Sequence, residues 1–246
     1  MTLEVTDNAD HSRSFDGIRR RAHARGLALR GAFHPAPGEF EGLLPGVRAG
    51  TMILLGFTGS LQWDLFRSSP EASDGMPHPL DRWSRRIIAA LAGELGAVDI
   101  YPNGPPPPLP FQQLAVRAEP VHPSPIGLLI HPEWGLWHAY RGALVLPDRI
   151  ELRAVEPSAH PCSLCASKPC LSSCPVQAFG GGTFDAQACI NHVQSAAGSD
   201  CRERGCRARR ACPVGPDYRY VEDQARFHMR AFLGSAICPG PPPARR

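Results

Sequence analysis

Cys162-Ser-Leu-Cys165-Ala-Ser-Lys-Pro-Cys170-Leu-Ser-Ser-Cys174-Pro175 is the stretch of the sequence with the strongest structural signal. It places four thiols within thirteen residues, and a proline follows the last of them. Each iron of a cubane iron–sulfur cluster takes one thiolate, and close spacing lets a single loop supply three of them. The trailing proline keeps the loop from continuing as a regular helix through its last ligand. The stretch is therefore typical of an iron–sulfur loop.

A second group of thiols follows, with Cys189 first and then Cys201, Cys206 and Cys212-Pro213. The first run resembles that of bacterial ferredoxins, with two residues inserted before the third cysteine. Because both loops end in Cys-Pro, we expect two clusters that share ligands crosswise, as in two-cluster ferredoxins. The first 4Fe–4S cluster is then predicted to take Cys162, Cys165, Cys170 and Cys212, and the second Cys174, Cys189, Cys201 and Cys206.

Two other uses of these thiols stay open at the level of sequence. Structural zinc usually takes paired C-x2–4-C knuckles, which Cys162–Cys165 fits and the wider Cys206–Cys212 does not. A single cluster with leftover thiols is the other alternative. Cys189 is the least secure ligand, because it lies in a predicted helix and could be an ordinary buried thiol. Cys238, in the proline-rich tail, has no assigned role.

The composition of the chain indicates the cellular compartment and therefore the redox state of these thiols. All nine cysteines of the 246-residue chain lie after residue 161. The polar first 14 residues lack the apolar segment of a secretory signal, and the apolar run Met52–Leu55 is too short to cross a bilayer. We therefore expect a cytoplasmic protein, in which reduced thiols bind metal and do not form disulfides.

The formal net charge of +3 counts the thiols as neutral. Two oxidised clusters, at about −2 each with their thiolates, would make the loaded chain slightly acidic. The charge therefore gives no footprint of nucleic-acid binding over the whole chain.

Sequence patterns divide the chain into four parts. We expect residues 1–15 to be a disordered leader, 16–155 an α/β domain, 156–233 the cysteine domain and 234–246 a proline-rich tail. In the α/β domain, a strand over 51–57, a helix over 81–95 with Asp81 as cap and Gly96 as end, and a strand over 97–101 predict a central sheet. Further expected elements are a helix over 15–29, strands over 128–130 and 143–146, a capped helix from Thr183 or Asp185 to Ala197, and a closing helix over 221–233.

Five arginines crowd the second cysteine loop, namely Arg202, Arg204, Arg207, Arg209 and Arg210. Positive charge near an anionic cluster stabilises its reduced form, and the same face could bind an acidic donor or a phosphate group. A solvated helix face explains the arginines equally well.

The stretch His131-Pro-Glu-Trp-Gly-Leu-Trp-His138 lies between the last two strands expected in the α/β domain. Its tryptophans, Trp134 and Trp137, could line a flat aromatic pocket between the two histidines. On residue types alone, a hairpin with core tryptophans is the simpler interpretation. No glycine-rich nucleotide motif is present.

The order of these segments resembles two known families. The stretch from Ile130 to Pro147 resembles a hairpin of the cobalamin-processing cblC type, as do Pro79–Trp83 and Tyr101–Asn103 upstream of it. Leu114–Ala118, the His131-Pro-Glu-Trp-Gly stretch and the cysteine domain together are similar to the epoxyqueuosine reductase family. This resemblance implies a nitroreductase-like corrinoid domain followed by two 4Fe–4S clusters. A flavin also stays possible, because nitroreductase-like folds hold one too.

The resemblance also suggests sites. Trp134, Trp137 and His138 are the expected cofactor contacts. The chain has no acidic residue from Gly104 to Arg117, where the reductase family carries its proton donor, so no catalytic residue is assigned.

The expected fold is α+β/α/β, with a nitroreductase-like sheet-and-helix domain followed by a small, mostly helical, loop-rich domain of the bacterial ferredoxin kind. The expected function is that of an iron–sulfur redox protein that passes single electrons to a corrinoid (cobalamin) on the N-terminal domain, as a cobalamin-dependent or cobalamin-processing reductase. A redox protein is its expected electron donor, and neither a membrane nor a nucleic acid is expected as a partner. The alternatives are a ferredoxin-type electron carrier without a corrinoid and a structural zinc-binding protein.

Overall fold

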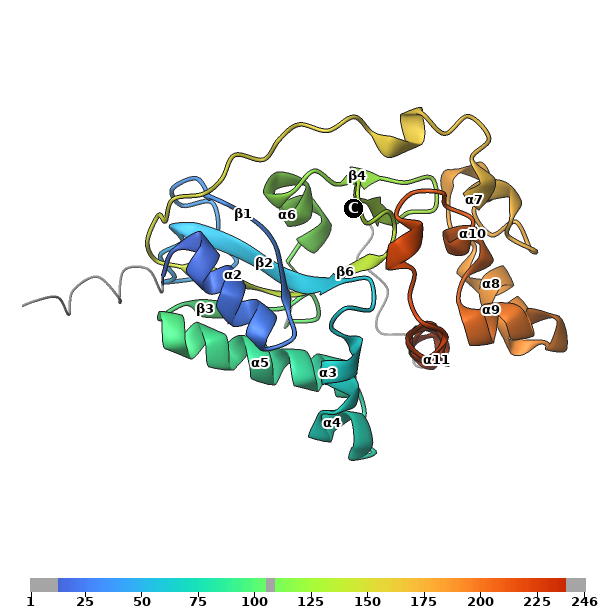
Figure 1. The fold of residues 1–246 in the computed structure, drawn as a ribbon, viewed down its shortest axis with the longest axis horizontal. Helices are drawn as coiled ribbons and strands as arrows, with labels where there is room; N and C mark the ends of the chain where they lie inside the picture. Colours follow the sequence, from blue (N-terminus) through green and yellow to red (C-terminus); the bar gives the residue numbers. More distant parts are fainter. Residues whose placement is uncertain (1–12, 105–108, 238–246) are drawn as a thin grey trace, which may run out of the picture. The chain divides into compact units, whose positions relative to one another are not determined.

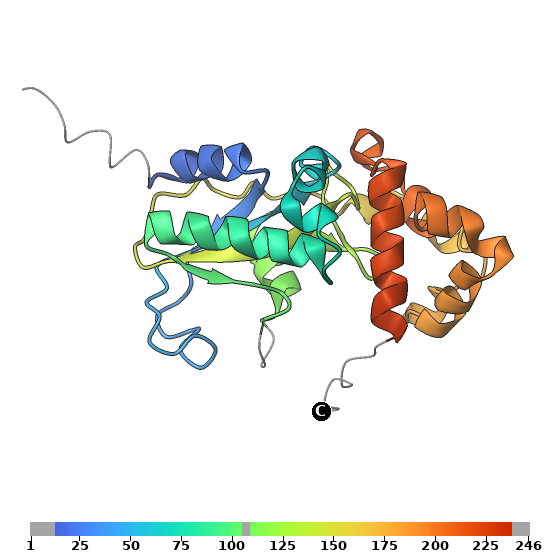
Figure 2. The ribbon, with the colours of Figure 1, turned by 90° about the horizontal axis from the view of Figure 1, so that it is seen from below.

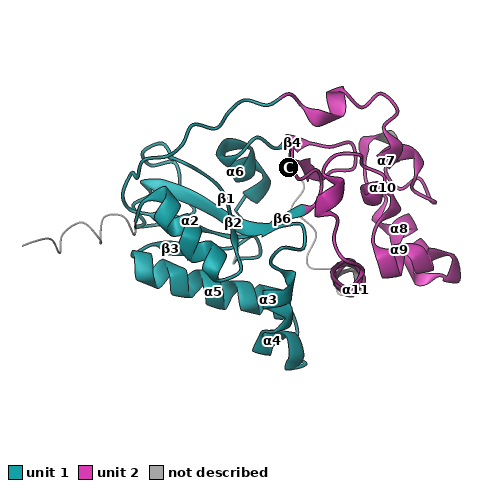
Figure 3. Cartoon of the chain, viewed as in Figure 1, with its two compact units in different colours: residues 1–121, 138–158 teal, residues 122–137, 159–246 magenta. Residues whose placement is uncertain are grey.

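The computed structural model describes residues 13–104 and 109–237 (Figure 1). It divides into unit 1, residues 1–121 and 138–158, and unit 2, residues 122–137 and 159–246 (Figure 3). The predicted boundary is therefore wrong for residues 122–137, which belong to the cysteine unit. This segment pairs its own short strands, β4 (His122–Pro123) and β5 (Leu129–Ile130), and does not join the sheet of unit 1.

Unit 1 is built on a four-stranded sheet in the order β1-β2-β6-β3. Every residue of the central strand β2 is buried, as expected for its continuous apolar run. The strands β2 and β3 run parallel to each other, but β6 lies between them in the opposite direction, so all neighbours are antiparallel. The strand–helix–strand pattern is present without the parallel pairing of an α/β fold. The strands are β1 (Ala28–Phe33), β2 (Thr51–Thr58), β3 (Val98–Ile100) and β6 (His138–Leu146).

Helices cover this sheet, with α5 (Pro79–Leu95) and α6 (Phe111–Ala118) on opposite sides (Figures 1 and 2). Gly96 ends α5 in the left-handed region, with φ +62°, as predicted. Asp81 is not the cap, because His78 takes that position. The Asp81 carboxylate instead accepts hydrogen bonds from Arg141 and, at 2.8 Å, from Asn103 Nδ2.

The first helix is shorter than the predicted one. It spans Phe15–Ala24 (α2) and begins at Ser14, whose Oγ accepts from the Gly17 amide at 3.1 Å. Gly26, with φ +80°, turns the chain, and Leu27 leads into β1, which begins at Ala28. The apolar residues at 27–29 therefore belong to a turn and a strand and not to a helix face.

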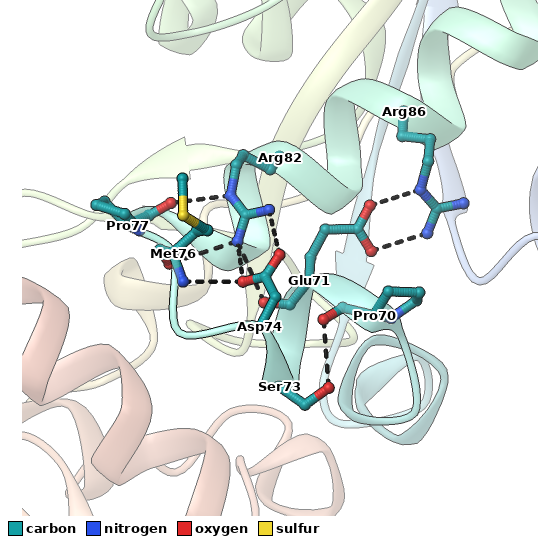
Figure 4. A network of polar contacts seen from close by, with 8 residues as sticks. All are labelled: Pro70, Glu71, Ser73, Asp74, Met76, Pro77, Arg82 and Arg86. Carbon is teal, nitrogen blue, oxygen red and sulfur yellow. Dashed lines mark hydrogen bonds and ion pairs between the residues drawn. The ribbon is translucent and has the colours of Figure 1, made fainter.

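Two short helices, α3 (Trp63–Arg67) and α4 (Pro70–Ser73), precede α5. Ion pairs join α4 and the turn after it to α5 (Figure 4). Arg82 binds both Asp74 oxygens at 2.6 and 2.7 Å, and Arg86 binds both Glu71 oxygens at 2.5 and 2.9 Å. The hydrogen bond from Arg86, opposed by burial, lowers the pKa of Glu71 to about 2.

A buried ion pair lies on the other side of the sheet. The side chain of Arg30 is fully buried and binds Glu119, with 2.9 Å between Nη2 and Oε1. Arg30 also donates to the Phe57 carbonyl at 2.7 Å, and Tyr140 donates its hydroxyl proton to Glu119. Each charged group therefore has partners that compensate the loss of water.

Unit 2 consists of the β4–β5 pair, short helices, turns and one longer helix, α11 (Glu222–Ile237). Asp185 caps α8, since its Oδ1 accepts from the Ala188 amide at 2.9 Å, as the sequence predicts. The predicted helix to Ala197 ends early at Gln194, and a 3-10 turn follows. The closing helix α11 continues past Leu233, whereas the leader to residue 12, the prolines 105–108, Cys238 and the rest of the tail lie outside the described residues. The helices are α7 (Pro169–Ser172), α8 (Ala186–Gln194), α9 (Ser199–Arg204), α10 (Arg207–Arg210) and α11 (Glu222–Ile237).

Among the described residues, no helix combines the length and apolar character needed to cross a membrane.

Candidate metal centres

The first group of thiols surrounds one small cavity in unit 2. Pro161 opens the 3-10 turn that carries Cys162, and Pro169 opens α7, which carries Cys170. A proline at the first helical position fixes the local backbone, so the side chains of both cysteines start from a defined backbone conformation. The four thiols that line the cavity are Cys162, Cys165, Cys170 and Cys212, and its remaining walls are Pro125, Ile130, Pro161, Lys168, Pro169, Pro213 and Val214.

The pKa values of these thiols report their mutual proximity. Burial raises the pKa of Cys162, and the negative charges of Cys212, Cys170 and Cys165 raise it further. The pKa of Cys170 is raised by burial and then by Cys212 and Cys165. Cys212 thus lies close to Cys162 and Cys170, although it follows both by more than forty residues in the sequence.

A second group of thiols forms around α8, α9 and the start of α10. Burial raises the pKa of Cys189 to about 11, with further contributions from Cys206, Cys174 and Cys201. Burial also raises the pKa of Cys206, and the backbone amides of Arg209 and Ala208 act in the opposite direction. The Ala178 amide donates to Cys174 Sγ at 3.4 Å. A bound metal would overcome this cost of forming thiolates, because it deprotonates its thiol ligands outright.

The eight thiols therefore fall into two sets of four, with Cys212 joined to the first run and Cys174 to the second loop. This grouping is the one expected from the crosswise rule of two-cluster ferredoxins. Cys189 takes part in the second set although it lies within a helix. In the described part of the chain, no three His, Cys, Asp or Glu side chains are close enough to hold a single metal ion. The role of the eight thiols as cluster ligands stays a prediction.

The segment 131–137 supports the end of the second cysteine loop, which sequence reasoning missed. A Cβ on Gly135, where φ is +58°, would lie 2.0 Å from the Val214 carbonyl oxygen. A Cβ on Gly215 would lie 2.5 Å from the backbone of Trp134. The two backbones are in direct contact just after Cys212-Pro213, and only glycine leaves room for this approach. Gly135 and Gly215 were the signal in the sequence that could have indicated this contact.

Side chains strengthen the same contact. Arg209 donates to the Leu136 carbonyl through Nη2 at 2.5 Å and Nε at 3.1 Å. Its guanidinium lies over the rings of Trp137 and Tyr220, 4.7 and 4.4 Å from their centroids. The Tyr218 hydroxyl donates to Glu133 at 2.6 Å. A solvated helix face is therefore the wrong interpretation for Arg209.

The predicted cofactor contacts already have protein partners. Trp134 stacks on His131, with 3.7 Å between ring centroids and 10° between planes. Trp137 is 3% exposed and packs against Arg209 and Tyr220. His138 is buried in β6 of unit 1, edge-on to Tyr140. The expected hairpin is not formed, because β5 pairs with β4 whereas β6 pairs with β2 and β3. The role of Trp134, Trp137 and His138 as cofactor contacts stays a prediction.

The remaining arginines of the loop also have partners. Arg202 donates to the Val193 carbonyl at 2.7 Å and thereby ties α9 to the end of α8. Arg204, Arg207 and Arg210 gather around the carboxylate of Asp200.

No protein-family model matches this sequence, and no curated protein matches it. Among solved structures, the chain is similar to epoxyqueuosine reductase from Bacillus subtilis, at 16% identity and a TM-score of 0.44, covering 71% of this chain and 50% of that one. A selenomethionine-labelled epoxyqueuosine reductase matches at 15% identity and a TM-score of 0.46, covering 86% and 68%. The reductase from Streptococcus thermophilus matches at 16% identity and a TM-score of 0.45, covering 80% and 65%. The chain thus spans half to about two thirds of the length of these proteins.

Proposed function

We propose that this protein is an iron–sulfur redox protein in which unit 2 binds two 4Fe–4S clusters. Cys162, Cys165, Cys170 and Cys212 would hold the first cluster, and Cys174, Cys189, Cys201 and Cys206 the second. When bound, the clusters would accept and release single electrons. The role of this chain is to position the clusters, shield them from water and set the charge around them.

One observation carries the proposal, namely that four thiols from two separate loops line a single cavity with largely apolar walls. An apolar cavity for free thiols has no evident use, whereas four thiolates around one centre are the donor set of a cubane cluster. The second set of thiols and the two Cys-Pro endings, Cys174-Pro175 and Cys212-Pro213, support the same assignment.

The identity of the metal tests this proposal first. Protein purified without oxygen is expected to contain iron together with acid-labile sulfide, and to bleach when dithionite reduces the clusters. Zinc bound to the thiols without sulfide would identify the alternative, a structural zinc-binding protein, and would contradict every redox role.

The finer part of the proposal is that the clusters pass electrons to a corrinoid bound by the N-terminal domain. It rests on the sequence resemblance of residues 130–147 and 114–118 to corrinoid proteins. Titration of the loaded protein with hydroxocobalamin should then change the corrinoid spectrum with a saturating midpoint. Absence of binding up to high micromolar hydroxocobalamin would contradict the corrinoid part of the proposal and would not affect the proposal of two clusters.

A ferredoxin-type electron carrier without a corrinoid is the second candidate. The packing of Trp137 beneath Arg209 and the stacking of Trp134 on His131 favour it, because both rings already have partners within unit 2. The hydroxocobalamin titration distinguishes the two candidates, because only the first predicts binding of the corrinoid. A cytoplasmic location belongs to both.

A further inference from the structure

An open, shallow hollow of about 580 Å³ lies on the surface of unit 2. Its lining combines three arginines with one carboxylate, and the six lining residues are Ser173, Asp200, Arg204, Arg207, Arg210 and Ala211. None of the roles argued above for the thiols or for Arg209 uses this hollow.

The hollow adjoins the thiols through the chain itself. Each of four lining residues is the direct sequence neighbour of a cysteine, in the pairs Ser173–Cys174, Asp200–Cys201, Arg207–Cys206 and Ala211–Cys212. Three of these four cysteines belong to the second set. A molecule seated in the hollow would therefore be close to the proposed second cluster.

The charge of the hollow is positive even though its arginines are paired. Asp200 binds Arg207 with 2.6 Å between Nε and Oδ2, and it also binds Arg210 and, at 3.5 Å, Arg204. One carboxylate thus serves three guanidinium groups, which leaves a formal excess of two positive charges. Glu222 also reaches Arg204 at 3.3 Å, but both side chains are more than half exposed, so solvent screens this pair.

Two of the arginines are exposed, whereas Cys201, the sequence neighbour of Asp200, is buried. The side chains of Arg204 and Arg207 are 57% and 48% exposed, and Cys201 is 6% exposed. An approaching protein meets the arginines before it meets the negative charge of a cluster. Exposed like charges around a redox centre raise the encounter rate with an oppositely charged partner.

We propose that this hollow is the docking surface for an acidic electron-donor protein and that electrons enter the chain at the second thiol set. This inference rests on the iron–sulfur function proposed above. In the step itself, one electron leaves the donor's reduced cofactor and one oxidised 4Fe–4S cluster gains it, with no bond broken and no proton moved. For an anionic flavin hydroquinone as donor, the product is the neutral semiquinone.

A protein surface fits the hollow better than a phosphate group or a nucleic acid. A single phosphate would have to share the three guanidinium groups with Asp200, which already occupies their common centre. A broad acidic surface instead reaches the outer, exposed faces of Arg204 and Arg207 and leaves Asp200 in place.

The test uses the full, cluster-loaded chain and flavodoxin hydroquinone as the acidic probe, with the rate of semiquinone formation as the readout. The wild-type rate should fall as ionic strength rises. The double variant R204E/R207E should be slower by about tenfold or more at low ionic strength and should lose this salt dependence. R230E makes an equal charge change per residue at an exposed arginine of α11 that does not line the hollow, and it should change the rate about twofold or less.

A variant of opposite sign guards against loss of structure. D200N removes the only carboxylate among the six lining residues and should raise the rate a few-fold at low salt. The extent of bleaching with excess dithionite is recorded for each variant. If wild type shows no reducible cluster, the proposed function itself fails.

Other outcomes would overturn the docking surface alone. One is full bleaching of all variants together with a flavodoxin rate that ignores the arginines. Another is a shifted cluster potential in R204E/R207E with unchanged salt dependence, which would make the arginines tuning residues. A third is loss of single-stranded oligonucleotide binding in R204E/R207E at an unchanged flavodoxin rate, which would assign the surface to a nucleic acid.

Discussion

The cores of the two units differ in what fills them. Unit 1 buries large apolar side chains completely, among them Phe57 and Phe66, and all eight residues of β2. In unit 2, one hydrophobic cluster has five buried members, and one of them, Cys212, is a thiol. Four more thiols pack against it, namely Cys162, Cys170, Cys174 and Cys206. Thiols in unit 2 thus stand where Leu, Ile and Phe stand in unit 1.

The difference indicates two sources of stability. Each large side chain buried in unit 1 contributes about 1.5–3 kcal/mol from apolar burial alone. A short-helix unit with a small core cannot gather many such contributions. Metal–thiolate bonds can supply the missing free energy, of the order of 10 kcal/mol or more in structural metal sites. Unit 1 should therefore fold through packing and unit 2 through its clusters.

Removal of the metal has the largest expected effect. Anaerobic iron chelation should abolish the hydrogen-exchange protection of α8, α9 and α10, because the thiols lose the centre that joins them. Protection of β2 and β6 should persist. Retained protection of unit 2 in iron-free protein would show that its packing suffices without metal.

The buried ion pair of unit 1 gives the next effect. Glu119→Leu leaves the fully buried Arg30 without its carboxylate and should lower the free energy of unfolding of unit 1 by about 3–5 kcal/mol. The matched change Glu94→Leu breaks exposed pairs with Arg21 and Arg25 and should cost about 1 kcal/mol or less. Denaturant unfolding followed by tryptophan fluorescence measures both, and equal losses would contradict the assigned role of burial.

Substitution of two glycines in unit 2 distinguishes the effect of backbone strain from the effect of close backbone contact. Gly135 and Gly127 both have positive φ, but only Gly135 faces another backbone, since a Cβ on Gly127 would meet open space. Gly127→Ala should cost about 1–2 kcal/mol through its left-handed conformation. Gly135→Ala should cost clearly more and should also speed loss of the chromophore under a chelator. Identical chelation rates would mean that the 131–137 segment does not support Cys212.

The smallest effect is the pH dependence of the link between α4 and α5. The folded pKa of Glu71 is depressed from 4.5 to about 2, so its stabilisation is present above pH 4.5 and is lost as the pH falls toward 2. Because Arg86 is half exposed, we expect a loss of about 1 kcal/mol for Glu71→Gln at pH 7. The difference between the two proteins should shrink by pH 3, as measured by denaturant unfolding. A constant difference from pH 7 to pH 3 would rule out the ion pair as its source.

Local patterns in the sequence predicted α2, β2, α5, β3 and β6 of unit 1 but not β1, α3, α4 or α6. The apolar run at 51–57 predicted β2, because a strand buried on both faces leaves a continuous apolar stretch. The four-residue repeat from Trp83 to Leu95 predicted α5, because a helix buried on one face leaves a periodic pattern. The antiparallel sheet was not predictable from element order, because the strand that separates β2 from β3 comes last along the chain. The two sets of four thiols match the grouping predicted from thiol spacing, the Cys-Pro endings and the crosswise rule of two-cluster ferredoxins.

Long-range contacts explain what the sequence analysis missed. Segment 122–137 precedes the first cysteine by more than twenty residues, yet it packs against the loop that ends at Cys212. Trp137 has the residue type of a cofactor contact, and only the position of Arg209 shows that its ring is covered. Neither contact leaves a periodic pattern in the sequence.

The iron and acid-labile sulfide content of wild type and of two single variants tests the central claim most directly. We predict about eight of each per wild-type chain and about four in Cys170→Ala and in Cys189→Ala, because each variant removes a ligand of one thiol set only. About four irons in wild type, or about eight retained in Cys189→Ala, would contradict the two-cluster assignment. Zinc in place of iron would contradict the redox function as well.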